Sequence, residues 1–310
     1  MHYYFAPLEG ITDRIFRQLH HKYFPGIDRY YTPFLSPTTH HTLTPKEQHE
    51  LDPKQLISFE LVPQILTKIP ENFLWMAKKC ADLGYTEINL NTGCPSGTVT
   101  AKGKGAGMLL HIDELDRFLD KIFRGTEVAI SIKTRIGFYS ADEFPALMDV
   151  FNRYPIKELT IHPRARQAFY SGDVDMGAFR YAYTTSKVSL CYNGDICSLS
   201  QLSQFTDAFP KLSSVMIGRG LVADPGMVSA GGTTTGTLRS FYEELLEHYI
   251  EAFGGARNAI FRMKEHWQYL LPSFENSEQL GKRLKKTTDI AEYRSLTQQI
   301  FSSLPLRINK

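Results

Sequence analysis

One cysteine, Cys94, stands where a short apolar segment gives way to a turn. Residues 87–95 read Glu-Ile-Asn-Leu-Asn-Thr-Gly-Cys-Pro, and asparagine, glycine and proline favour a turn over continuation of a strand. Residues 96–107, which follow, are rich in glycine and should form a pliable loop. The pattern therefore places a thiol on a loop at a strand end. Taken alone, such a cysteine is more often structural than catalytic, so the other polar residues have to decide its role.

Other polar or glycine-flanked positions fall at the ends of predicted strands. They are Ala6-Pro7-Leu8-Glu9, Gln64, Asn91, Lys133, His162-Pro163-Arg164, Asn193-Gly194-Asp195 and Gly218-Arg219-Gly220. In a βα barrel, site residues lie at the C-terminal ends of the strands, and the last two loops commonly hold a phosphate. A buried lysine such as Lys133 is costly unless it meets an anion or a polar ligand. The set as a whole predicts a phosphate-bearing ligand.

The elements that would position these residues alternate along the chain. Strands are predicted at residues 3–6, 29–32, 58–61, 87–91, 129–133, 158–162, 188–193 and 214–218. Helical patterns such as 71–81 and 112–123 lie between them, with apolar residues at threes and fours. This rhythm of βα units predicts an α/β fold, a (β/α)8 TIM barrel. A doubly wound open sheet is the alternative, although it usually carries fewer strands.

The alternation of predicted strands and helices stops after the last predicted strand. Residues 231–236 read Gly-Gly-Thr-Thr-Thr-Gly, a polar, turn-forming link, and from Leu238 onward the pattern is helical with no candidate strand. We therefore predict two domains, a barrel over residues 1–232 and a small C-terminal helical domain over residues 233–310.

Composition excludes some classes of protein. The chain has 310 residues, of which 42% are hydrophobic and 22% charged, with a net charge of +2. These are ordinary values for a globular protein, and no apolar run approaches the ~20 residues that span a membrane. The N-terminus does not have the pattern of a signal peptide. The four cysteines form no CxxC pair, and His40, His41 and His49 lack partners at metal-ligand spacing, so we expect free thiols, a cytoplasmic location and no metal.

The motifs together resemble the tRNA-dihydrouridine synthase family, in its bacterial form. The resemblance rests on residues 6–13 (Ala-Pro-Leu-Glu-Gly-Ile-Thr-Asp), Asn91-Thr92-Gly93-Cys94-Pro95, Lys133-Thr134-Arg135, His162-Pro163-Arg164, Asn193-Gly194-Asp195 and Gly218-Arg219. It runs through the whole barrel in order, and the Asn-x-Gly-Cys-Pro piece is the most specific. Leu8 stands where many members have methionine. The helical tail resembles the tRNA-binding domain of the family in position and type only.

The resemblance implies an FMN enzyme that uses NADPH to reduce specific uridines of tRNA to 5,6-dihydrouridine. The residues implied to hold FMN are Ala6, Pro7, Leu8, Gln64, Asn91, Lys133, His162, Asn193, Gly194, Asp195, Gly218 and Arg219. Gln64 would hydrogen-bond the polar edge of the ring, and Lys133 would stabilise the negative charge of the reduced ring. Arg219 suits a phosphate. Asn91 would help to orient the base or the flavin.

The resemblance also implies a role for Cys94 as general acid. Hydride from flavin N5 would go to uracil C6, and Cys94 would deliver a proton to C5 from the opposite face. A free thiol has a pKa of about 8.5, so it is mostly protonated at neutral pH yet can still give up its proton. A carboxyl group would already be ionised.

Folded tRNA exposes a uridine to such a site only after the base leaves its stack. Basic residues that could contact the RNA are Arg164 and Arg166 after the sixth strand, Lys102 and Lys104 beside Cys94, and Lys282, Arg283, Lys285 and Lys286 in the tail. For Arg164 and Arg166, salt bridges on the barrel rim are an equally good explanation. For the tail, composition alone favours a solvated helix face, and the resemblance favours RNA.

Two alternatives stay open from the residues alone. One is an FMN-dependent barrel reductase of a free pyrimidine such as dihydroorotate, which would need neither the basic tail nor the loop lysines. The other is a non-catalytic RNA-binding barrel, against which Gln64, Cys94, Lys133 and Arg219 argue. The sequence does not identify the uridine that is reduced, nor decide between NADPH and NADH. The resemblance favours a monomer.

Overall fold

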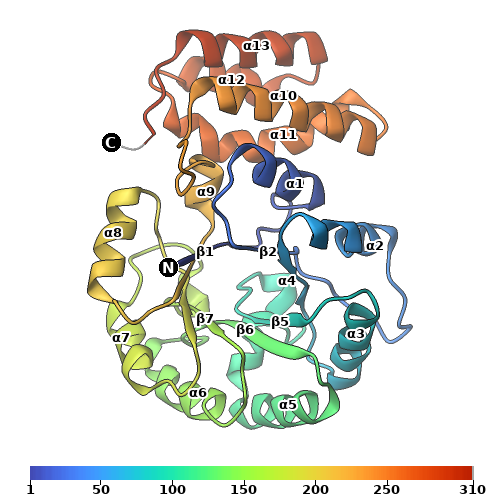
Figure 1. Cartoon of the computed structure of the whole chain (residues 1–310), viewed down its shortest axis with the longest axis vertical. Helices are drawn as coiled ribbons and strands as arrows, with labels where there is room; N and C mark the ends of the chain where they lie inside the picture. The colour runs from blue at the N-terminus through green and yellow to red at the C-terminus, as the bar shows by residue number, and fades with distance from the viewer. Residues whose placement is uncertain (309–310) are drawn as a thin grey trace. The chain divides into compact units, whose positions relative to one another are not determined.

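The computed structural model describes residues 1–308 and contains a parallel sheet of nine strand segments (Figure 1). In spatial order these are β3 (Glu60–Val62), β2 (Arg29–Tyr31), β1 (His2–Phe5), β9 (Ser214–Ile217), β8 (Leu190–Tyr192), β7 (Leu159–His162), β6 (Ala129–Arg135), β5 (Glu87–Thr92) and β4 (Gln64–Ile65). Each strand of the central run pairs in parallel with the next strand along the chain, which is the signature of repeated βα units. The predicted (β/α)8 class is confirmed.

The ninth segment arises from a proline. We expected one strand at 58–61, but Ser58 follows a 3₁₀ segment, Pro53–Ile57, and the strand begins at Glu60. Pro63 then interrupts it, because proline has no N–H to donate to a neighbour. β3 pairs with β2 and β4 pairs with β5, while the Pro63 carbonyl accepts from the Asn89 N–H at 2.8 Å. The two ends of the sheet are thus consecutive pieces of one interrupted strand, and the barrel closes through it.

Helices follow the strands as the sequence patterns predict. Along the barrel they are α1 (Arg14–Tyr23), α2 (Pro45–Glu50), α3 (Pro70–Asp82), α4 (Gly97–Thr100), α5 (Ile112–Gly125), α6 (Phe144–Phe151), α7 (Met176–Thr185), α8 (Leu199–Ala208) and α9 (Arg219–Ala223). The helices predicted at 71–81 and 112–123 are α3 and α5. The tail forms α10 (Thr235–Ala252), α11 (Ala256–Leu270), α12 (Glu278–Lys286) and α13 (Ile290–Ser303). Its predicted helical character is confirmed.

The described chain packs as two compact units. The first comprises Met1–Ala6, Arg29–Gly194 and Lys211–Met216. The second comprises Pro7–Asp28, Asp195–Pro210 and the chain from Ile217 onward, so α1, α8 and α9 group with the four tail helices. In the second unit Lys22 and Tyr23 of α1 both donate to Glu244 of α10, at 2.7 and 2.6 Å. The domain boundary at 232 and 233 remains a prediction.

The barrel interior holds an apolar cluster and, at the strand starts, a buried ion group. Tyr4, Ala6, Tyr31, Val62, Cys191 and Met216 form the apolar cluster. At the strand starts, Arg29 lies 3.4 Å from Glu87, and Lys157 lies 2.6 Å from the same carboxylate. Burial raises the pKa of the nearby Glu158, whose carboxylate accepts from Ser214 at 2.7 Å. In such barrels this end serves stability, which leaves the C-terminal strand ends for chemistry.

Candidate active site

Cys94 is fixed on both sides by backbone hydrogen bonds. The Asn91 Oδ1 atom accepts from the Gly93 N–H at 3.0 Å and from the Cys94 N–H at 2.9 Å, so this side chain closes the turn after β5. The Cys94 carbonyl in turn accepts from the Ala106 N–H at 3.1 Å. The thiol is half-buried and forms no disulfide. The sequence therefore places a defined thiol at the mouth of the barrel.

The glycine-rich segment after Cys94 is more ordered than a pliable loop. It forms α4 and then a 3₁₀ segment, Gly105–Leu110. Gly105 has a φ of +55°, and a Cβ there would lie 2.9 Å from the Cys94 carbonyl oxygen. A Cβ on Gly107 would lie 2.8 Å from the Thr100 carbonyl. These glycines permit close packing of backbone against backbone around the cysteine.

A chain of hydrogen bonds between polar side chains links the neighbouring strands β4, β5 and β6 next to the Cys94 turn. Asn91 Nδ2 donates to Gln64 Oε1 at 2.7 Å, and Gln64 Nε2 donates to Asn89 Oδ1 at 2.8 Å. Asn89 Nδ2 then donates to Ser131 Oγ at 2.9 Å. All four side chains are buried, so their amide orientations are held by one another. Asn89 and Ser131 were missed from the sequence, although the two-residue spacing of Asn89 and Asn91 places both on one face of β5.

Lys133 lies beside Asn91 on the neighbouring strand. The two residues are register partners in β5 and β6. Among residues 1–308, no acceptor makes a hydrogen bond or ion pair with the Lys133 ammonium. Burial, together with the charge of Arg135, lowers the pKa of Lys133 to about 8. A cation so placed is stabilised by any anion that enters the barrel mouth.

Two arginines hold the carbonyls on either side of Cys94. Arg135 Nε donates to the Gly93 carbonyl at 2.9 Å, and its guanidinium lies 5.3 Å from the ring centre of Tyr170. Arg166 Nε donates to the Pro95 carbonyl at 3.1 Å, and its Nη2 donates to Thr100 Oγ1 at 3.1 Å. The role of Arg135 was missed, although it stands in the quoted Lys-Thr-Arg motif. These two side chains define the position of the Gly-Cys-Pro turn.

His162 and Arg164 form a neighbouring buried pair. Arg164 Nη1 lies 3.1 Å from His162 Nε2, and Arg164 Nε donates to the Gly172 carbonyl at 3.2 Å. Arg164 is only 3% exposed. The His162 ring is stacked on that of Tyr170 at a centroid distance of 6.0 Å. The guanidinium of Arg164 is therefore held inside the protein.

The last strand ends also carry the residues expected there. In the first unit, Asn193 Nδ2 donates to the Met216 carbonyl at 2.8 Å. In the second unit, Arg219 Nη2 lies 2.6 Å from Asp195 Oδ1, and Gly218 immediately precedes α9. Both of these charged side chains are partly exposed, and a guanidinium fork suits a phosphate.

The backbone expected to contact the flavin is itself folded tightly after Ala6. The Leu8 N–H donates to Thr12 Oγ1 at 2.8 Å, and the Leu8 carbonyl accepts from the Ile11 and Thr12 N–H groups at 3.0 Å each. The Leu8 amide is thus already engaged within the turn. Gly10, two residues on, has a φ of +79°.

A basic cluster lies beside the Cys94 loop. Lys104 is half-buried, and its pKa is lowered by burial and by the charges of Lys102 and Lys68. Lys68 was not singled out from the sequence. In the second unit, Lys282, Arg283, Lys285 and Lys286 are exposed on α12, with Arg283 3.3 Å from Glu292. In the described part of the chain, no three His, Cys, Asp or Glu side chains gather as metal ligands. None of its helices is long and apolar enough to cross a membrane.

The fold defines the class of protein, a TIM-type barrel with its polar residues at the C-terminal strand ends. The barrel is similar to solved structures of morphinone reductase in complex with tetrahydroNAD (TM-score 0.50, 11% identity, 73% of this chain and 84% of that one). It is also similar to a variant of NCR from Zymomonas mobilis (TM-score 0.50, 10% identity, 78% of this chain and 86% of that one). At these identities the likeness concerns the fold.

The family follows from the sequence. The family model described as dihydrouridine synthase matches residues 4–304, so the chain belongs to the dihydrouridine synthase family and is an oxidoreductase enzyme. The tRNA-dihydrouridine synthase B of Pasteurella multocida is 27% identical over 224 residues, which cover 72% of this chain and 66% of that protein. A probable tRNA-dihydrouridine synthase of Staphylococcus aureus is 25% identical over 309 residues, covering 95% of this chain and 91% of that protein.

Proposed function

We propose that this protein reduces specific uridines of tRNA to 5,6-dihydrouridine, with FMN as cofactor and NADPH as electron donor. The observation that carries the proposal is the placement of Cys94. Asn91 closes the turn that contains Cys94, and Arg135 and Arg166 hold it. This turn follows β5, and Lys133 lies on the adjacent strand, β6. Curated relatives named tRNA-dihydrouridine synthase support the same reaction.

The residues at the strand ends fit a flavin. FMN, when bound, supplies the hydride that is added to uracil C6. We propose that Ala6, Pro7, Leu8, Gln64, Asn91, Lys133, His162, Asn193, Gly194, Asp195, Gly218 and Arg219 hold it. Lys133 fits because its ammonium has no anionic partner among residues 1–308 and has a pKa lowered to about 8. Gln64 fits because its amide orientation is fixed by Asn89 and Asn91.

Cys94 then donates a proton to uracil C5. A thiol carries a proton that it can transfer to a carbon on which negative charge develops. The hydrogen bonds to its own N–H and carbonyl fix the backbone of Cys94 and do not engage the thiol. Arg135 and Arg166 keep the turn in place by holding the two flanking carbonyls.

We propose that Lys102 and Lys104, with Lys68, contact the RNA phosphates near the reacting base. Their mutual repulsion favours a polyanion. Lys282, Arg283, Lys285 and Lys286 of α12 are proposed to extend this contact. Arg164 and Arg166 already donate to protein carbonyls, so we assign them to the walls of the site instead. We place the enzyme in the cytoplasm as a monomer.

The test is turnover by purified protein. We expect flavin-loaded enzyme to oxidise NADPH and to form dihydrouridine in unmodified tRNA transcripts. Matched reactions should contain free orotate or uracil at the same pyrimidine concentration. Turnover of the free pyrimidine without tRNA turnover would replace the proposal with a small-molecule reductase. Tight tRNA binding without flavin binding would replace it with a non-catalytic RNA-binding barrel.

A further inference from the structure

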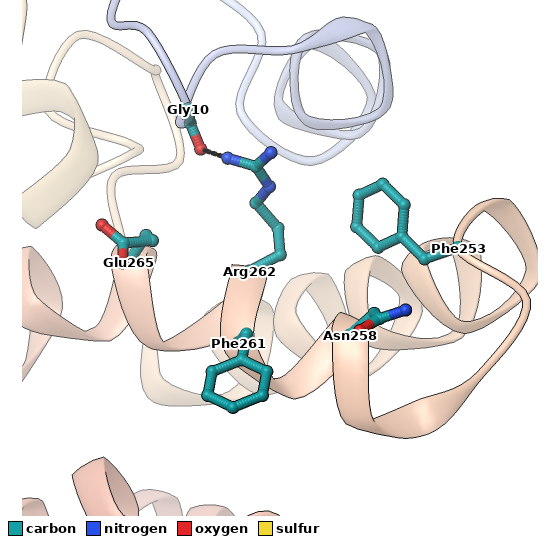
Figure 2. A pocket seen from close by; sticks show the side chains of 6 residues that line it. All are labelled: Gly10, Phe253, Asn258, Phe261, Arg262 and Glu265. Atoms are coloured by element: carbon teal, nitrogen blue, oxygen red, sulfur yellow. Dashed lines mark hydrogen bonds between the residues drawn. The ribbon is translucent and has the colours of Figure 1, made fainter.

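An open pocket of about 540 Å³ lies within the second unit, on a face of α11. Asn258, Phe261, Arg262 and Glu265 line it from α11, Phe253 lines it from the end of α10, and Gly10 lines it from the loop before α1. The α11 residues are three and four positions apart, so they share one helix face. Figure 2 shows them following one another along the helix, with the Phe253 ring beside the Arg262 side chain.

Two phenylalanine rings in this pocket are exposed to solvent. Phe261 is 49% exposed and Phe253 is 37% exposed. Arg262 extends past Phe253, with its guanidinium 5.9 Å from the ring centre, and donates to the Gly10 carbonyl. Arg262 also lies 4.0 Å from Asp13. The guanidinium is therefore held by the Gly10 carbonyl and the Asp13 carboxylate, and together with the rings it offers planar surfaces for stacking.

The polar groups of the pocket suit a neutral base rather than a phosphate. Within residues 1–308 the Asn258 amide makes no hydrogen bond, and Glu265 has one weak partner, Gln268 Nε2 at 3.3 Å. An amide offers both donor and acceptor, as the edge of a nucleobase requires. The Glu265 carboxylate repels phosphate but accepts from a ribose hydroxyl or an amino group.

The surrounding charges indicate which polymer would bring that base. α11 carries Arg257, Arg262 and Lys264 against the single acid Glu265, whereas α10 carries Glu243, Glu244, Glu247 and Glu251 against Arg239. The Lys264 ammonium lies 5.1 Å from the ring centre of Phe261, where it can meet a phosphate next to a stacked base. A polyanion is thus favoured along α11 and opposed along the acidic helix α10.

We propose that this pocket binds one unstacked nucleotide of the tRNA, different from the uridine that is reduced, and so helps to select the tRNA and its orientation. The inference rests on the proposed function for the identity of the RNA. Phe253, Phe261 and Arg262 stack on the base, Asn258 contacts its edge, and Glu265 accepts from the ribose 2′-hydroxyl. Single-stranded RNA is commonly read in this manner, by stacking and by contacts to base edges.

The test is binding of an unmodified tRNA transcript to the flavin-loaded full chain, followed by fluorescence anisotropy. Phe261→Ala and Asn258→Ala alter exposed side chains, and Leu199→Ala on α8 is a control of similar exposure (46%) outside the pocket. We expect the dissociation constant to rise roughly five- to 150-fold for Phe261→Ala, the range for one lost stacking contact. The control should be unchanged, as should flavin content and melting temperature.

Two further measurements locate the effect. In turnover, the Phe261→Ala variant should show a raised KM for tRNA and a kcat within about twofold of wild type. Phe261→p-azidophenylalanine should crosslink on illumination to one unpaired nucleotide of the transcript. An unchanged dissociation constant, or crosslinks spread along the RNA as for the same probe at Leu199, would overturn the proposal. Because binding and crosslinking need no turnover, they stand even if dihydrouridine formation fails.

Discussion

At the scale of single residues, the site combines one thiol with one unpartnered cation. Cys94 is fixed through its backbone, and Lys133 has no acceptor among the described residues. The placement of Lys133 does not favour folding, because a buried ammonium without a partner costs free energy. Lys133 lies on β6 and Cys94 in the turn after the adjacent strand β5, so we propose that an anion and the reacting base bind between them.

Lys133 should destabilise the flavin-free protein at neutral pH. Its pKa falls from 10.5 to about 8 on folding, so the unfolded chain binds more protons between these values. The wild type should then gain stability as the pH rises from 8 toward 10, and Lys133→Met should lack this gain. Below pH 8 the variant should be the more stable, by at most about 3 kcal/mol. Urea unfolding at pH 7 and pH 9.5 gives the free energy of unfolding of each protein. An equal change in this free energy between the two pH values for wild type and variant would contradict the prediction.

Gly105 should be required for the position of Cys94. Gly105→Ala adds a Cβ 2.9 Å from the Cys94 carbonyl at a φ of +55° and should lower kcat by about tenfold or more. Gly232→Ala is the matched control, because Gly232 has a φ of +60° with no atom within 4 Å of the added Cβ. Backbone strain is similar in the two variants. Equal losses of kcat would show that strain, rather than contact with Cys94, is responsible.

At the scale of elements, much of the arrangement could be predicted from patterns. Strand positions agree within about two residues, because apolar runs with turn residues at both ends have few other structures. The break at Pro63 was missed, because the two-residue strand β4 is too short to show the alternation of apolar and polar residues that predicts a strand. The chain of hydrogen bonds between polar side chains was missed in part, because Gln64 and Asn89 meet only through the register of separate strands. Arg164 and Arg166 could not be assigned, because the sequence does not show which carbonyls they meet.

Arg166 separates support of the turn from contact with RNA. Its donors already meet the Pro95 carbonyl and Thr100, so Arg166→Gln should lower kcat while leaving the dissociation constant for tRNA nearly unchanged. If Arg166 instead contacts a phosphate, the variant should bind tRNA more weakly. The slope of the logarithm of the binding constant against the logarithm of the salt concentration should then fall by about one. Anisotropy titrations at several salt concentrations, combined with single-turnover rates, distinguish these results.

At the scale of the whole molecule, α12 adds a basic surface to the second unit. Lys282 and Lys286 are exposed on it, so Lys282→Gln with Lys286→Gln should weaken tRNA binding and lower the salt slope of the binding constant by about 0.7–0.9 per lost phosphate contact. Lys79→Gln, an exposed lysine on α3, is the control. A slope equal to that of the wild type would show that α12 is only a solvated helix face.

Reduction of tRNA through Cys94 is tested most directly in cells that lack the gene. Dihydrouridine should be mapped at each D-loop and variable-loop position in tRNA from deleted, complemented and Cys94→Ala strains. The account predicts loss at one or two positions, restored by the wild type and not by Cys94→Ala, although the variant still binds flavin and tRNA. Full restoration by Cys94→Ala would contradict the assignment of Cys94 as proton donor. An unchanged map in the deleted strain, together with no turnover of transcripts in vitro, would contradict the proposed reaction itself.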